Sequence, residues 1–169
     1  MREQDVEYVR WQNRATRFYL ASRSLYDRQL FGPSAYCCHQ AVELIMKATL
    51  IYWDASFRPF AAGHNLAKMV RMTRNKVRGG RNFVIPSYLT HEQRFLRVTR
   101  YPTQGKGVLV PGHMIDDLDQ VFADLILLVP FQFNTELLRS VTGRNRRDLL
   151  VLRRRNKQMR RLRRFLAAA

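Results

Sequence analysis

The sequence predicts an all-α protein, an up-and-down antiparallel helical bundle of about five helices with a basic helical extension at its C-terminus. Apolar residues recur at spacings of three and four along most of the chain. Glycine and proline interrupt these periodic segments, and no segment shows the sustained alternation of a β-strand flanked by hairpin turns. We assign residues 1–138 to the bundle and residues 139–169 to the basic extension. A chain of 169 residues is long enough to bury a core of its own.

The first two predicted helices cover residues 5–30 and 34–53. The apolar positions of the first are Val6, Tyr8, Trp11, Ala15, Phe18, Leu25 and Tyr26. Gly32 and Pro33 are expected to end it, since glycine permits a turn and proline suits the first turn of the next helix. The second helix is expected to bury Ala35, Cys38, Ala41, Val42, Ile45, Met46, Thr49 and Leu50.

Three further helices are predicted downstream. The third begins near His64 and carries Leu66, Met69 and Val70, after which the segment GGRNFVIPS breaks the periodicity. A short helix is predicted for residues 89–98. A long apolar helix begins at about Met114, and Pro130 is expected to kink or end it.

The positive charge is concentrated in the last 31 residues. The whole chain has a formal net charge of +17, and residues 139–169 hold 12 basic residues and one acidic residue, or +11. Such a segment favours salt-sensitive binding to RNA or DNA. Docking on an acidic partner protein or membrane surface, or a merely solubilising role, remains open. The arginines expected to contact phosphate are Arg144, Arg146, Arg147, Arg153, Arg154, Arg155, Arg160 and Arg161.

The remaining composition indicates a soluble, cytoplasmic protein. Cys37 and Cys38 are adjacent, so a bridge between them would be strained and would close no useful loop. The chain opens on a polar segment, and its most apolar run is interrupted by Asp124 and Pro130, which argues against a signal peptide or a membrane span.

Three stretches together resemble the HEPN family, the helical domains of higher eukaryotes and prokaryotes named for nucleotide binding. SAYCCHQAVELIMKATL is similar to the second helix of the family, GHNLAKMV to the entry into its third helix, and TRYP to its Arg-Tyr-Pro motif. Their order and spacing agree with the family over roughly residues 5–135. The resemblance implies a helical bundle that commonly forms homodimers.

Two activities occur in the family that the sequence resembles. Some members are metal-independent ribonucleases that use an arginine followed, after four to six residues, by a histidine. Others lack this motif and bind a minimal nucleotidyltransferase, often in a toxin–antitoxin pair. Here only Arg58 and His64 have the required spacing, and they lie earlier than the family's catalytic motif. The leading hypothesis is therefore a non-catalytic protein that binds a nucleotide or a nucleic-acid phosphate and works with a partner.

Two alternatives to this hypothesis remain. One is a divergent ribonuclease that uses Arg58 or Arg100 with His64. The other is an adaptor whose basic segment docks on RNA or an acidic partner, with the bundle serving for dimerisation.

The candidate ligand-binding residues come from the three family-like stretches. Gln40, Glu43 and Lys47 occupy one polar helix face, where an amide and an ammonium can bind a nucleotide. The alternative is a solvated face with an ordinary Glu43–Lys47 ion pair. Arg100 suits a phosphate or carboxylate and Tyr101 can stack on a base, although Arg100 could instead pair with Glu43.

His64 and several acidic residues have more than one interpretation. His64 either titrates near neutral pH at the site or caps and buttresses the third helix. Aspartates crowd the long apolar helix, where carboxylates in the first turn suit the helix dipole, so we predict no metal site and no cofactor.

Overall fold

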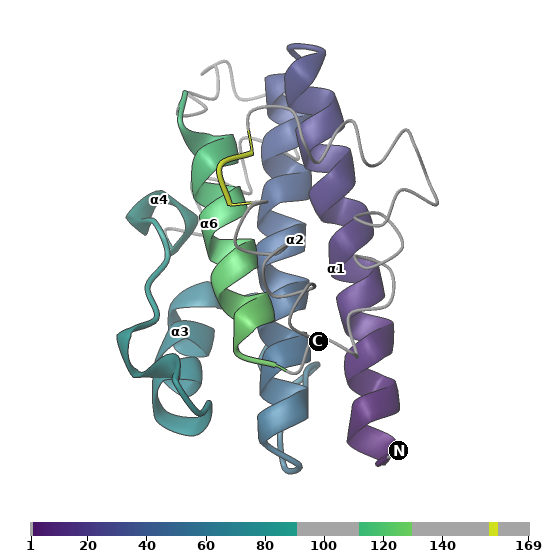
Figure 1. Ribbon diagram of the computed structural model, residues 1–169, viewed down its shortest axis with the longest axis vertical. Helices are drawn as coiled ribbons and strands as arrows, with labels where there is room; N and C mark the ends of the chain where they lie inside the picture. Colours follow the sequence, from purple (N-terminus) through teal and green to yellow (C-terminus); the bar gives the residue numbers. More distant parts are fainter. Residues whose placement is uncertain (1, 91–111, 130–155, 159–169) are drawn as a thin grey trace.

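The computed structural model describes residues 2–90, 112–129 and 156–158. These ranges contain five α-helices and a short 3₁₀ helix (Gly80–Asn82), and they contain no β-strand, which confirms the predicted all-α bundle. The α-helices are α1 (Glu3–Asp27), α2 (Phe31–Trp53), α3 (Leu66–Lys76), α4 (Ser87–Thr90) and α6 (Met114–Leu127) (Figure 1).

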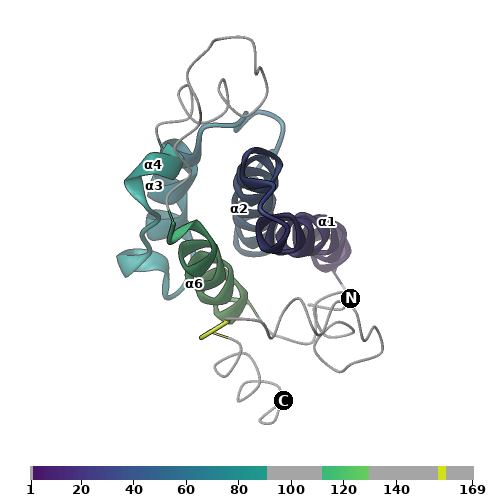
Figure 2. The same cartoon turned by 90° about the horizontal axis from the view of Figure 1, so that it is seen from above.

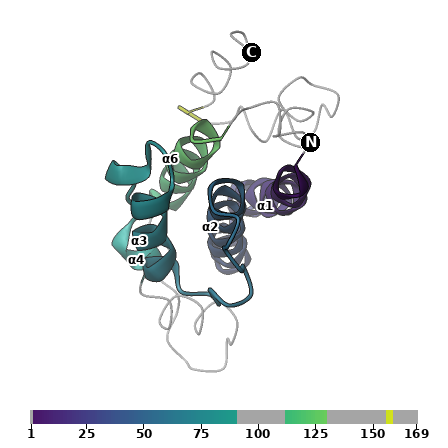
Figure 3. The ribbon, with the colours of Figure 1, turned by 90° about the horizontal axis from the view of Figure 1, so that it is seen from below.

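Helix α2 lies at the centre of the bundle. Seen along the bundle from either end, it stands between α1 on one side and α3 and α6 on the other (Figures 2 and 3). The hydroxyl of Tyr26, near the end of α1, donates to the carbonyl of Gly112 before α6. The indole of Trp53, at the end of α2, donates to the carbonyl of Leu128 after α6. Helix α6 therefore runs antiparallel to α1 and parallel to α2.

The central position of α2 explains its burial. Every residue from 41 to 51 is buried, and all eight residues of the predicted apolar side belong to the interior. Glu43 and Lys47, on the predicted polar side, are buried as well. The solvated alternative for these two residues is therefore wrong, because other elements cover both sides of the helix.

The turn between α1 and α2 differs from the prediction. Helix α1 ends at Asp27, three residues before the predicted end at residue 30, with Gln29 in the left-handed region at a φ of 62°. The amide of Leu30 donates to the carbonyl of Leu25 at 2.9 Å, which satisfies an end-of-helix carbonyl. Pro33 lies in the first turn of α2, as predicted, where a missing backbone N–H costs no hydrogen bond. Gly32 also lies in that first turn and not in the turn between the helices.

The buried face of α1 is more polar than its periodicity predicted. Of the seven apolar positions expected there, Tyr8 and Ala15 are fully buried and the others are partly exposed. The remaining buried positions of this helix are Asp5, Gln12, Thr16, Tyr19, Ser22 and Arg23. Hydroxyl groups in this interface bond to nearby carbonyls; Ser22, for example, donates to the carbonyl of Ser34 at 2.9 Å. Small hydroxyl side chains thereby allow α1 to approach α2 closely.

A buried ion pair joins α1 to α6. The guanidinium of Arg23 contacts both carboxylate oxygens of Asp119, and both side chains are almost fully buried. The hydroxyl of Tyr19 donates to the same carboxylate at 2.7 Å, and its ring stacks on Phe122 with centroids 4.3 Å apart. Burial raises the pKa of Tyr19 above its usual value, which keeps this donor protonated. Burial also raises the pKa of Asp119 to about 6, so it is still charged at neutral pH.

A short part of the basic extension lies against the ion pair. The amide of Asn156 donates to the hydroxyl of Tyr19 at 2.9 Å, and Gln158 donates to Gln120 on α6. Residues 156–158 thus contact the same two helices that Arg23 and Asp119 join. The predicted boundary between residues 138 and 139 lies outside the described residues.

The other predicted boundaries agree with the structure where it describes them. Helix α3 starts at Leu66, two residues after the predicted start near His64, and its cap is Asn65, whose side chain accepts from the amide of Lys68 at 2.8 Å. His64 is therefore not the helix cap. Helix α6 starts at the predicted Met114 and ends before Pro130, whereas most of the predicted 89–98 helix lies outside the described residues. None of the described helices combines the length and apolar character needed to cross a lipid bilayer.

Replacing Asp119 by alanine is expected to lower the free energy of unfolding by about 3–5 kcal/mol, because it leaves the buried Arg23 charge without its partner. Urea denaturation followed by circular dichroism measures this loss. Asp116→Ala is the matched control, because Asp116 is exposed on the same helix and its removal should change stability by less than about 0.5 kcal/mol. A loss below about 1 kcal/mol for Asp119→Ala would show that the Arg23 charge is solvated in the native state.

Candidate functional site

The candidate site is centred on the carboxylate of Glu43 in the middle of α2. Its side chain is 2% exposed and accepts a hydrogen bond from the ammonium of Lys47 at 2.8 Å, the pairing that the spacing of four predicted. Lys47 is itself only 6% exposed, and its ammonium lies 5.7 Å from the centroid of the Trp11 ring on α1. The ion pair is thus closed off between two helices.

His64 reaches the same carboxylate from the segment between α2 and α3. Its Nδ1 atom lies 3.0 and 2.9 Å from the two carboxylate oxygens of Glu43. Gly63, at a φ of 61°, and the capping Asn65 flank this histidine and fix the direction of the chain. With Glu43 ionised, Nδ1 carries the ring proton and donates a hydrogen bond to the carboxylate. Nε2 is then an acceptor for a group outside the protein. The imidazole is 58% exposed, so a ligand can reach it.

Two further polar side chains of α2 lie near Glu43 among the described residues. His39, one turn earlier and fully buried, places Nδ1 at 3.9 Å from the carboxylate. Gln40 lies on the same helix face as Glu43 and Lys47, and its Nε2 is buried with no hydrogen-bond partner among the described residues. A buried donor without an acceptor costs about 1–3 kcal/mol, so this amide is an unsatisfied polar group beside Glu43. We name Gln40, Glu43, Lys47 and His64 the Glu43 cluster.

An exposed aromatic ring lies beside the Glu43 cluster, and sequence reasoning missed it. Phe60 is 88% exposed and meets Trp11 edge to face, with ring centroids 5.9 Å apart. Trp11 in turn lies against Lys47. The Arg-Pro-Phe stretch, an aromatic residue beside arginine and proline in a predicted loop of a basic chain, is the sequence signal that could have pointed to it. Such a ring can stack on a nucleic-acid base.

The other predicted site residues are not all described. Arg58 is exposed, and its guanidinium donates to the carbonyls of Ala55 and Phe57 in its own loop, at 3.2 and 3.5 Å. Arg100 and Tyr101, and the eight arginines predicted to bind phosphate in the basic extension, lie outside the described residues. Their roles, including a pairing of Arg100 with Glu43, stay predictions.

The residues of the Glu43 cluster lie in a segment that matches a known domain family. The family model described as the HEPN domain matches residues 8–105, more than half of the chain. The chain belongs to the HEPN domain family. Neither the comparison with curated proteins nor the comparison with solved structures gave a significant match.

The matched HEPN region contains every member of the Glu43 cluster as well as Trp11 and Phe60. Within the described part of this HEPN chain, no three His, Cys, Asp or Glu side chains gather in a way that could hold a metal ion. Asp119, one of the aspartates on α6, is engaged by Arg23 and Tyr19 instead. The chemistry that the described cluster offers is hydrogen bonding and proton transfer by a carboxylate-held imidazole.

Replacing Glu43 by alanine is expected to lower the free energy of unfolding by about 3–5 kcal/mol, because the Lys47 ammonium would stay buried without a counter-charge. Chemical denaturation measures the loss. Glu7→Ala removes an exposed glutamate from α1 and should change stability by less than about 0.5 kcal/mol. The double variant Glu43→Leu with Lys47→Met should recover most of the loss, since it removes both charges. If the double variant were less stable than Glu43→Ala, the ion pair would not explain the effect.

Proposed function

We propose that this HEPN domain binds a nucleotide or a nucleic-acid phosphate without catalysing a reaction, and that it works with a partner protein such as a minimal nucleotidyltransferase. The observation that carries the proposal is the Glu43 cluster: a buried carboxylate holds an exposed imidazole, next to an amide that lacks an acceptor. The buried Glu43–Lys47 ion pair therefore positions the exposed imidazole of His64.

The members of the cluster divide the work by their burial. His64 offers Nε2 as an acceptor for a ribose hydroxyl or a base N–H, and Phe60 offers a face for base stacking. Gln40 is proposed to donate to a phosphate or ribose oxygen. Glu43 and Lys47 are too deeply buried to reach a ligand directly, so we assign them the role of positioning His64. Arg100 and Tyr101 are proposed to add a guanidinium and a second ring to the same site. The basic extension is proposed to add sequence-independent affinity for RNA.

The proposals about the partner protein and the oligomeric state rest on membership of the HEPN family. We propose a homodimer, and a partnership of the toxin–antitoxin type, because family members commonly associate in these ways. A basic chain of net charge +17 also suits an acidic partner surface.

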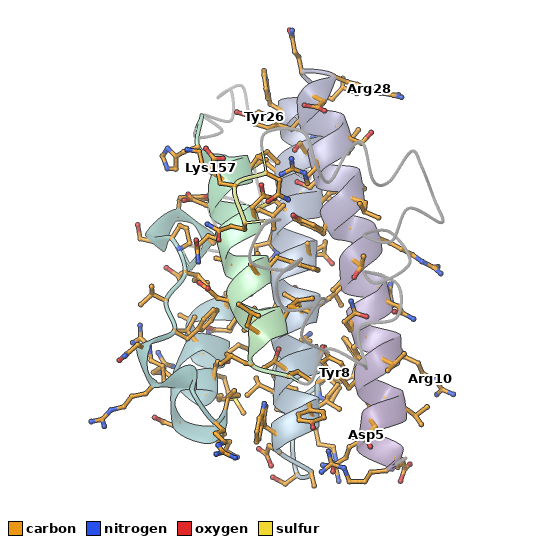
Figure 4. All side chains as sticks on the ribbon, viewed as in Figure 1. Asp5, Tyr8, Arg10, Tyr26, Arg28 and Lys157 are labelled. Atoms are coloured by element: carbon orange, nitrogen blue, oxygen red, sulfur yellow. The ribbon has the colours of Figure 1, made fainter. Side chains whose placement is uncertain are left out.

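Single-stranded RNA and a mononucleotide are expected to bind the full chain at low salt, measured by fluorescence anisotropy and calorimetry. His64→Ala and Arg100→Ala should weaken binding about tenfold, and Phe60→Ala should cost about 1–3 kcal/mol through lost stacking. Arg28→Ala is the matched control for charge. Trp11, which lies against Lys47, is in the first half of α1, whereas Arg28 follows the last residue of that helix, at the opposite end from the labelled Asp5 and Tyr8 (Figure 4). Absence of binding, or equal affinity for all four variants, would contradict the proposal.

A divergent metal-independent ribonuclease is the second candidate, and the Glu43–His64 contact favours it. A carboxylate that holds Nδ1 of a histidine orients Nε2 as a general base, as in hydrolase triads. Five residues separate Arg58 from His64, which fits the spacing of the family's ribonucleases.

The ribonuclease candidate predicts that the chain cleaves RNA in the presence of a metal chelator, and that His64→Ala or Arg58→Ala reduces the rate at least 100-fold. Gel analysis of a labelled oligonucleotide measures cleavage. Cleavage that persists in His64→Ala would remove this histidine from the mechanism and point to a contaminating nuclease or another site.

A further inference from the structure

A pocket of about 250 Å³ lies between α3 and the segment that follows α2. One wall is a single face of α3, on which Lys68, Met72 and Lys76 are spaced four residues apart. The opposite wall is formed by residues 54–62 of the loop. The loop residues that line it are Asp54, Ser56, Phe57, Arg58, Ala61 and Ala62. The pocket shares no lining residue with the Glu43 cluster.

Hydrogen bonds within the loop hold this wall in place. The carboxylate of Asp54, which follows the last residue of α2, accepts from the amide and the hydroxyl of Ser56 at 3.0 and 2.6 Å. It also accepts from the ammonium of Lys76 at 2.6 Å, which ties the loop to α3. Farther along, the amide of Ala62 donates to the carbonyl of Arg58 at 3.2 Å. The pocket therefore exists before any ligand binds.

The lining carries more positive than negative charge. Arg58, Lys68 and Lys76 are cationic, and Asp54 is the single carboxylate among the lining residues, so the balance is 3 − 1 = +2. Lys76 and Ser56 lower the pKa of Asp54, so its charge is already matched by Lys76. The ammonium of Lys68 has no ion pair or hydrogen bond among the described residues. The charges of Arg58 and Lys68 are not neutralised by a carboxylate of the lining, so the pocket favours an anionic ligand.

The remaining lining defines the size and chemistry of that anion. Phe57, Ala62 and Met72 give the pocket an apolar part that a ring or small hydrocarbon group can contact. Its volume lies just below the roughly 300–1,000 Å³ of pockets for drug-sized ligands, which fits one small molecule. Guanidinium and ammonium groups together bind phosphate oxygens well.

We propose that the pocket between α3 and residues 54–62 binds a small organic phosphate monoester, of the size of a nucleoside monophosphate. The phosphate lies between Lys68 and Arg58, and the organic group lies on Phe57 and Met72. Lys76 supports the site by holding Asp54, and with it the loop, against α3. This site is additional to the proposed nucleotide surface at the Glu43 cluster, and different substitutions test the two sites.

Calorimetric titration of the full chain at low salt with adenosine 5′-monophosphate, inorganic phosphate and adenosine tests the site. The monophosphate is expected to bind at least tenfold more tightly than either fragment. Lys68→Gln should weaken it at least fivefold, and because this ammonium has no ion pair, the variant should keep its fold. Arg71→Gln removes an exposed charge of α3 that does not line the pocket, so it should bind as the wild type does.

His64→Ala separates this site from the one at the Glu43 cluster. This variant removes the contribution of His64 to any mononucleotide binding at the Glu43 cluster, and the monophosphate binding that remains should still fall at least fivefold when Lys68→Gln is added. Equal affinity for adenosine and its monophosphate would overturn the pocket proposal, as would monophosphate binding that is lost in His64→Ala and retained in Lys68→Gln. No binding of the monophosphate at millimolar concentration would overturn it as well.

Discussion

The buried carboxylate of Glu43 is the interaction on which the arrangement of α2 and the following loop depends. An ionised carboxylate in the interior is stable only when charged and hydrogen-bonding partners surround it. Lys47 supplies a partner from the same helix, and His64 supplies one from a loop 21 residues later. The contact with His64 ties the end of the loop between α2 and α3 to the middle of α2. The start of the same loop, which forms a wall of the pocket, is held separately, because Lys76 on α3 donates to Asp54.

The pair of Arg23 and Asp119 plays the corresponding part between α1 and α6. These residues lie 96 positions apart in the chain, and Tyr19 and Asn156 join them in one network. Replacing such a pair by apolar residues often leaves stability unchanged or raises it, so the pair is not needed for stability as such. We infer that it fixes the pairing of α1 with α6, since an apolar contact would tolerate sliding of one helix along the other.

The two polar networks have different consequences for function. The Arg23–Asp119 network is closed, because its charged groups are buried and face each other. The Glu43 cluster is open at one side, because His64 is largely exposed and Gln40 keeps an unused donor. An open network can exchange a partner with a ligand at little cost. This difference supports the proposal of a binding role for the Glu43 cluster and a structural role for Asp119.

The sequence by itself determined the all-α class, the apolar side of α2, the start of α6, the Glu43–Lys47 pairing and membership of the HEPN family. These properties depend on residues close together in the chain, where periodicity and spacing report geometry directly. The tertiary structure alone decided that the polar side of α2 is buried, that Gln29 rather than Gly32 forms the turn, and that the interior face of α1 is polar. It also decided that His64 contacts Glu43, that Phe60 is exposed beside Trp11, and that Arg58 and Lys68 line one pocket. Periodicity describes the faces of a single helix, whereas these properties depend on which other segment covers each face.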